Sequence, residues 1–167
     1  RFLKNICGMW LLESCRKNWP DISYPDLIAE AMEAAPFRSF INPDDATFAC
    51  PENMETAIKA YCQRTNQPVP EERAAITRCI FESLALRYRQ VLEQLDSLSD
   101  RKAEVLHIIG GGSKNALLNQ WTANSIGREV IAGPAEATAL GNIMVQALAN
   151  HVGQNIAELR KLAKKGL

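Results

Sequence analysis

The sequence lacks any excess of charge of one sign, because its 167 residues include 19 Lys and Arg against 19 Asp and Glu. This balance gives no reason, over the chain as a whole, to expect binding to nucleic acid or to an anionic membrane surface. The sequence also lacks the run of about 18 consecutive apolar residues that a membrane-spanning helix needs. With 47% hydrophobic and 23% charged residues, the composition is that of a folded globular domain, which excludes disordered, collagen-like and low-complexity chains.

The five cysteines lack the spacing of a metal site. None of them forms a Cys-x-x-Cys pair, and neither His107 nor His151 stands at a ligand spacing from them. An odd number of cysteines without a pairing framework is typical of a reducing cytosol, where cysteine serves as a small apolar side chain. We therefore expect a cytoplasmic protein with free cysteines and with no metal ligands in this chain.

Apolar residues at helical spacing predict helices along most of the chain. The predicted helices cover residues 4–18, 24–35, 52–65, 71–98, 115–126, 135–149 and 156–165. Ser23, Pro25 and Asp26 supply a capping side chain, a first-turn proline and an early acid for the second of these helices. Gly127 stands where a left-handed helix C-cap is expected. Residues 37–42 alternate briefly and predict a short strand followed by a loop.

The character of the chain changes after residue 101. Residues 105–109 are apolar and β-branched, which predicts a buried parallel strand, and residues 129–132 predict a second strand. The order strand, helix, strand, helix over residues 104–150 predicts a parallel sheet with helices against it. Two clear strands are few for so many helices. We therefore expect a helix-rich α/β fold with a small, mostly parallel sheet, of which part is hidden or missing.

Three glycines and a serine, residues 110–113, follow the first predicted strand. Glycines here permit a sharp turn and let a ligand approach bare backbone, and the following helix offers free N–H groups and the positive end of its dipole. Two familiar phosphate-binding motifs are not matched: GxxxxGK[ST] is absent, and Asn115 takes the place of the third glycine of GxGxxG. From these residues alone, ligand binding and a plain tight turn both stay open.

A second segment of small residues, 133–142, follows the second predicted strand. Small side chains allow another part of the backbone to approach closely. We expect this segment to pack beneath the glycine-rich turn rather than to contact a ligand directly.

Four segments, taken together, carry a resemblance to a known family. They read FLKNICGMW (2–10), CIFESLA (79–85), IGGGSKN followed by LLNQ (109–120), and AGPAEATALGN (132–142). The set is similar to segments of the FGGY family of carbohydrate kinases. The first and last segments resemble the rhamnulokinase branch of that family in particular, and the resemblance extends from Phe2 to about Gln146.

The resemblance implies the actin–hexokinase fold, in which two ribonuclease-H-like domains enclose a nucleotide cleft. Residues 1–167 would form a single partial domain, part of the C-terminal nucleotide-binding domain. The N-terminal domain of the same polypeptide, with the phosphate-holding loops and the catalytic Asp, would be absent from this chain. No catalytic residue is therefore expected here, and the chain alone is expected to be inactive.

The resemblance also implies a reaction, in which the intact enzyme uses ATP and Mg²⁺ to phosphorylate the 1-hydroxyl of L-rhamnulose, a ketose sugar. Two alternatives stay open. One is another FGGY sugar kinase, acting on L-fuculose or xylulose. The other is a non-catalytic α/β module that binds a nucleotide or a sugar phosphate.

By position, the resemblance assigns site residues. Gly111 would line the adenosine site, Gly110 and Gly112 would shape the loop, and Asn115 would approach the adenine edge. Asn5 matches a substrate-site Asn at the cleft.

Glu13 is the one departure among the matched positions, because relatives commonly have a nucleotide-contacting Gln there. A carboxylate only accepts hydrogen bonds at neutral pH and repels phosphate, whereas Gln also donates. Glu13 is therefore assigned to the ATP site by position only.

Overall fold

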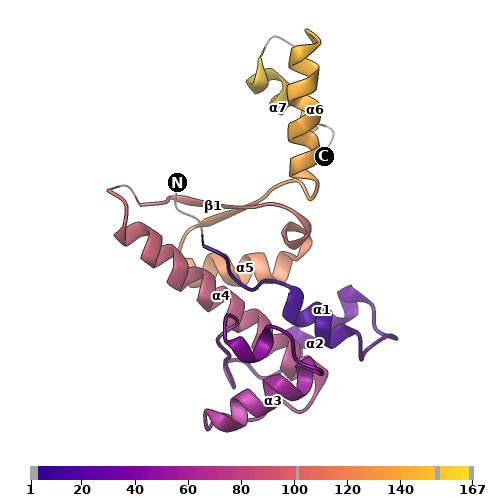
Figure 1. Cartoon of the computed structure of the whole chain (residues 1–167), viewed down its shortest axis with the longest axis vertical. Coiled ribbons are helices and arrows are strands. Elements are labelled where there is room, and N and C mark those ends of the chain that lie inside the picture. Colours follow the sequence, from indigo (N-terminus) through magenta and orange to yellow (C-terminus); the bar gives the residue numbers. More distant parts are fainter. Residues whose placement is uncertain (1–3, 101, 153–154, 166–167) are drawn as a thin grey trace.

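Helices account for most of the computed structural model, which describes residues 4–100, 102–152 and 155–165 (Figure 1). The helices are α1 (Trp10–Arg16), α2 (Tyr24–Glu33), α3 (Met54–Arg64), α4 (Arg73–Ser97), α5 (Ala116–Ile126), α6 (Ala137–Ala149) and α7 (Ile156–Lys165). The strands are β1 (Val105–Ile108) and β2 (Glu129–Ala132), and short 3-10 turns cover Ala46–Phe48 and Gly111–Lys114. None of the helices in these ranges is long and apolar enough to cross a membrane.

Helix α4 is the centre of the packing. Its apolar residues contact neighbours on more than one side, because α2 and α5 both pack against it. Ile76, Ile80 and Leu84 are fully buried there, and Phe81 beside them is buried as well. The apolar core therefore lies between α4 and the helices around it rather than on the sheet.

The two strands pair in parallel, as predicted, with Val105 opposite Glu129 and Ile108 opposite Ala132. The prediction that the first strand is buried is wrong: His107 is exposed and the other residues of β1 are only half-buried. A parallel strand is buried when helices cover both faces of its sheet. Here α6 has no buried residue, and together with α7 it projects away from the strands (Figure 1).

The first helix is shorter than predicted. It begins at Trp10 rather than at residue 4, and residues 4–9 precede it without regular structure. The backbone N–H of Cys7 donates a hydrogen bond to Oδ1 of Asp44 at 2.8 Å instead of to a helix carbonyl. Gly8 also disfavours a helix at this point. Residues 2–3 of the segment that resembles the kinase family lie outside the described residues.

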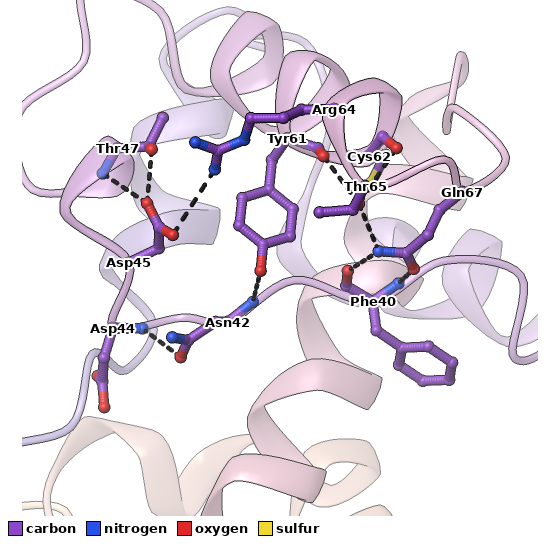
Figure 2. Close-up of polar contacts among 10 residues, drawn as sticks. All are labelled: Phe40, Asn42, Asp44, Asp45, Thr47, Tyr61, Cys62, Arg64, Thr65 and Gln67. Carbon is purple, nitrogen blue, oxygen red and sulfur yellow. Dashed lines mark hydrogen bonds and ion pairs between the residues drawn. The ribbon is translucent and has the colours of Figure 1, made fainter.

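Residues 37–42 form no strand, contrary to the prediction, because side chains rather than a neighbouring strand satisfy their backbone. Figure 2 shows the Gln67 amide bonded to both backbone groups of Phe40, accepting from its N–H at 2.7 Å and donating to its carbonyl at 2.8 Å. The N–H of Asn42 donates to the Tyr61 hydroxyl at 3.2 Å. The segment therefore begins in a turn, with Phe37 at φ of 55°, and its backbone is bonded to the end of α3 and to the residues that follow.

Helix boundaries with a clear chemical signal agree with prediction. The Ser23 hydroxyl caps α2 by accepting from the N–H of Asp26 at 3.3 Å. Gly127 ends α5 in the left-handed conformation, with φ of 64°.

Candidate functional site

The glycine turn, Gly110–Lys114, joins the end of β1 to the start of α5. Gly110 has φ of 83°, a conformation that a residue with a Cβ adopts only with strain. Its carbonyl accepts hydrogen bonds from the N–H of Ser113 at 3.0 Å and from the Ser113 hydroxyl at 2.8 Å. The turn is therefore closed by its own bonds and does not depend on a ligand for its shape.

The glycine turn is also fastened to the loop that follows β2. The N–H of Gly110 donates to the carbonyl of Pro134 at 3.3 Å, and the N–H of Gly133 donates to the carbonyl of Ile108 at 2.7 Å. A Cβ at Gly133 would lie 3.0 Å from Cγ2 of Ile109, so only glycine fits there without a shift. For these first residues of segment 133–142, the structure supports packing beneath the turn.

The outer side of the glycine turn is open. A Cβ added to Gly111 or to Gly112 would meet no atom within 4 Å. Gly112 borders a hollow of about 820 Å³ that also touches the N-terminal segment, α4 and β1. A ligand in this hollow could therefore reach the backbone of Gly112, whereas Gly110, Gly111 and Asn115 are not among its lining residues.

The N-terminal segment lies at the same hollow. Lys4 and Ile6 line it, whereas Asn5 between them is exposed and is not one of its lining residues. The structure thus brings the segment that carries Asn5 to the hollow beside the glycine turn.

Asp44 holds this segment in place. Besides accepting from Cys7, its carboxylate forms an ion pair with Arg87 on α4, with 2.7 Å between Nη2 and Oδ2. Burial alone would raise the pKa of Asp44, but the hydrogen bonds from Cys7 and Arg87 outweigh it and hold the pKa below its usual value. The segment beside the hollow therefore depends on a charged carboxylate.

This lowered pKa has a consequence for acid stability. Asp44 stabilises the fold above its unfolded-state pKa of about 3.9, and the stabilisation is lost as the pH falls from there through the lower folded-state pKa. We expect the free energy of unfolding to fall less between about pH 6 and about pH 3 in an Asp44→Asn variant than in the parent. Urea unfolding followed by circular dichroism measures this difference, and an equal fall in both proteins would contradict it.

Asn115 is buried, with only 2% of its surface exposed. Its Oδ1 caps α5 by accepting from the N–H of Leu118 at 3.0 Å, and its Nδ2 donates to the Tyr24 hydroxyl at 3.5 Å. In this structure the side chain therefore serves the start of α5, and its contact with an adenine edge stays a prediction.

Glu13 lies on α1 with half of its side chain exposed (50%), and its Oε2 is 3.3 Å from Nη1 of Arg16. The Arg16 guanidinium lies 5.2 Å above the centre of the Tyr24 ring. Burial raises the pKa of Tyr24, the hydrogen bond from Asn115 lowers it, and the charges of Glu13 and Arg16 act on it in opposite directions. Glu13 and Asn115, both assigned to the ATP site by position, thus influence the same tyrosine.

Comparison with known families decides the assignment. The family model of the C-terminal domain of FGGY carbohydrate kinases matches residues 1–150. The chain belongs to the FGGY family of carbohydrate kinases. This membership confirms the expected fold class, the actin–hexokinase-like fold, of which the described residues form a helix-rich part with a small parallel sheet.

Curated relatives of this FGGY chain are named rhamnulokinase. One from Bacteroides thetaiotaomicron is 62% identical over 167 residues, which is 100% of this chain and 34% of the relative. One from Enterobacter sp. (strain 638) is 46% identical over 160 residues, covering 96% of this chain and 33% of the relative. One from Bacillus subtilis (strain 168) is 40% identical over 165 residues, covering 98% and 34%. The chain thus spans about a third of the length of these relatives.

Two residues near the predicted site of this FGGY chain, Tyr24 and Arg16, were not foreseen from the sequence. The Ser-Tyr-Pro-Asp run indicates a helix start, which explains Ser23 and Pro25 but assigns no role to the aromatic side chain. Tyrosine at such a position has an apolar ring and a polar tip that seeks a partner when buried. The Tyr24 hydroxyl therefore indicates a polar partner, but that partner, Asn115, lies 91 positions away in the sequence.

Proposed function

We propose that the full-length protein is an ATP-dependent rhamnulokinase that transfers the γ-phosphoryl group of ATP to the 1-hydroxyl of L-rhamnulose. The observation that carries this proposal is the 62% identity, over every residue of the chain, to a protein named rhamnulokinase. The chain would supply the adenosine side of the nucleotide cleft. Support for that role comes from the glycine turn, which is closed by its own bonds, has space for a ligand outside Gly111 and Gly112, and borders the hollow at Gly112.

In this proposal Gly111 presents bare backbone to the adenosine, and Gly110 and Gly112 set the shape of the turn. The start of α5 adds the positive end of the helix dipole, which favours an electron-rich ligand edge. Asn5 would contact the sugar from the N-terminal segment. Phosphoryl transfer relies mainly on positioning and charge stabilisation, and the carboxylate that takes the hydroxyl proton would belong to the rest of the polypeptide.

Mg²⁺ is the metal that a kinase of this kind uses with ATP. Within residues 4–100, 102–152 and 155–165, however, no three His, Cys, Asp or Glu side chains gather into a group that could hold a metal ion. We place the Mg²⁺ contacts in the rest of the polypeptide, with the catalytic Asp and the phosphate-holding loops that the family resemblance assigns there.

We infer that residues 1–167 are one partial domain and that the N-terminal domain belongs to the rest of the protein. The length of the relatives supports this, as does the sheet, in which β1 has a neighbour along one edge only in the described part of the chain. We also place the enzyme in the cytoplasm, because all five cysteines are free thiols, a state that a reducing compartment maintains.

A substrate panel on the full-length protein tests the sugar. We expect kcat/KM for L-rhamnulose to exceed that for L-fuculose and for D-xylulose by at least about tenfold, the discrimination that one or two substrate contacts provide. A preference for either of the other sugars would replace the proposed substrate. No phosphorylation of any ketose, with ATP still bound, would favour a non-catalytic binding module.

The purified 167-residue chain is expected to show no sugar kinase activity, because the catalytic carboxylate and the phosphate-holding loops are assigned to the missing part. The assay couples ADP formation to a spectrophotometric readout, with the full-length protein as the positive control. Circular dichroism confirms that the chain is helical under assay conditions. ADP formation above background that depends on L-rhamnulose would refute the assignment of catalysis to the rest of the polypeptide.

A further inference from the structure

The hydroxyl of Tyr24 joins three separate parts of the chain. It belongs to the first turn of α2, it accepts a hydrogen bond from Nδ2 of Asn115 at 3.5 Å, and it lies 4.0 Å from Sδ of Met9, to which it donates. Met9 belongs to the segment that lines the hollow, and Asn115 begins the helix behind the glycine turn. The Tyr24 hydroxyl thus connects the N-terminal segment at the hollow with the start of α5 behind the glycine turn.

The other bonds of Asn115 show why this connection matters. Its Oδ1 accepts a hydrogen bond from the backbone N–H of Leu118. The backbone N–H of Asn115 donates to the carbonyl of Gly112 at 3.1 Å. Tyr24 is thus the partner of the remaining polar group, the amide nitrogen, in a side chain that is 2% exposed. A buried amide that loses its partner incurs a desolvation cost, which favours a different orientation of the side chain. Reorientation would release the N–H of Leu118 and loosen the backbone of Asn115, which is bonded to Gly112 of the glycine turn.

Tyr24 is itself firmly held. Ser23 caps the helix immediately before it, and Pro25 fixes the backbone immediately after it. The Arg16 guanidinium covers the ring at 5.2 Å and is in turn paired with Glu13. Burial raises the pKa of Tyr24, so the hydroxyl stays protonated at neutral pH and can both accept and donate.

We propose that Tyr24 is a positioning residue for the nucleotide, acting through Asn115 to hold the glycine turn and the first turn of α5 in their binding geometry. This inference rests on the proposed function, because it assumes that the glycine turn binds the adenosine part of ATP. It adds a residue that touches neither substrate and that lies on a helix outside the turn.

The test is a Tyr24→Phe variant of the full-length enzyme, which keeps the ring beneath Arg16 and removes only the hydroxyl. We expect KM and Kd for ATP to rise about 3- to 10-fold, the effect of one lost hydrogen bond, with kcat and the KM for the sugar unchanged. Tyr61→Phe is the matched control: it removes a hydroxyl that accepts from the N–H of Asn42, far along the chain from the glycine turn (Figure 2). Its ATP affinity should equal that of the parent.

The results distinguish the positioning role of Tyr24 from the adenosine site at the glycine turn. Unchanged ATP affinity in Tyr24→Phe, with affinity lost in Gly111→Val, would overturn the positioning role and leave the adenosine site in place. Unchanged affinity in both variants would overturn the adenosine site itself. An equal rise in Tyr24→Phe and Tyr61→Phe, or a fall in kcat of the same size, would show a general loss of stability and overturn the positioning role.

Discussion

A full-length protein carrying Gly111→Val is expected to lose about 10- to 100-fold in ATP affinity while keeping its fold, since a change of this size in a binding pocket is worth about 1–3 kcal/mol. The fold should survive because Gly111, unlike Gly110, does not have a positive φ and because a Cβ there meets no atom within 4 Å. The branched valine side chain would instead occupy the open side of the glycine turn, where the proposed ligand approaches the backbone. Isothermal titration calorimetry with ATP measures the loss.

Two further variants separate a blocked site from a damaged fold. Ala103→Val adds two methyl groups at an exposed position just before β1, at the opposite end of the strand from the glycine turn, and should leave ATP affinity unchanged. Gly110→Ala should destabilise the protein by about 1–3 kcal/mol, because residue 110 has φ of 83° and ψ of −169°, a backbone conformation that only glycine adopts readily. A folded Gly111→Val protein that binds ATP like the parent would exclude the glycine turn as the adenosine site.

Glu13 departs from the family's usual Gln, and the position of Arg16 alters what this departure implies for nucleotide binding. A lone carboxylate near a nucleotide would repel its phosphates, but here an arginine one turn further along α1 neutralises it at 3.3 Å. The pair presents carboxylate and guanidinium groups together, so it offers both acceptors and donors, as the amide of a Gln does. Glu13 is thereby compatible with a nucleotide contact, provided that Arg16 accompanies it.

The parts of the fold that the sequence predicts well have local causes. The apolar spacing of α4, the β-branched run of β1 and the glycine that ends α5 are each explained by residues close together in the chain. Residues 37–42 show the opposite case. Their alternation is typical of a strand, but their backbone partners include Gln67 and Tyr61, which no local pattern assigns to them.

The candidate site also combines features with local causes and features that depend on residues far apart in the chain. The sharp turn at Gly110 could be predicted because three adjacent glycines follow a strand, and Gly110 has φ of 83° there. The role of Asn115 as the cap of α5 also follows from its place before the helix. Its bond to Tyr24 joins residues 91 positions apart, and the hollow beside the turn depends on how α4 packs. These features exist only in the folded chain.

The stability of the helical part depends on another long-range connection, made by Arg78 on α4. Its Nε lies 2.7 Å from Oε1 of Glu82, in a pair whose side chains are only 12% and 5% exposed. The other carboxylate oxygen accepts from the N–H of Phe37 at 3.0 Å. Nη1 of Arg78 donates to three carbonyls at the end of α2, at 3.2, 2.9 and 2.8 Å. The guanidinium also lies 4.8 Å above the ring of Trp121 on α5.

Arg78 therefore connects α2, α4 and α5, and its removal should have a large effect. An Arg78→Met variant leaves Glu82 as a buried, unpaired carboxylate and leaves the last carbonyls of α2 without their donor. We expect the free energy of unfolding of the purified chain to fall by about 3–5 kcal/mol, the usual cost of removing one partner of a buried ion pair. Urea unfolding followed by circular dichroism provides the measurement.

The same helix offers a matched control in Arg89, which pairs with Glu93 at the same four-residue spacing and at 2.8 Å. Those side chains are 54% and 60% exposed, so water screens the pair. Arg89→Met should therefore change the free energy of unfolding by only about 0.3–0.5 kcal/mol. Burial and the additional bonds to α2, rather than the Arg–Glu spacing, account for the difference. Equal losses in Arg78→Met and Arg89→Met would show that Arg78 does not hold the three helices together.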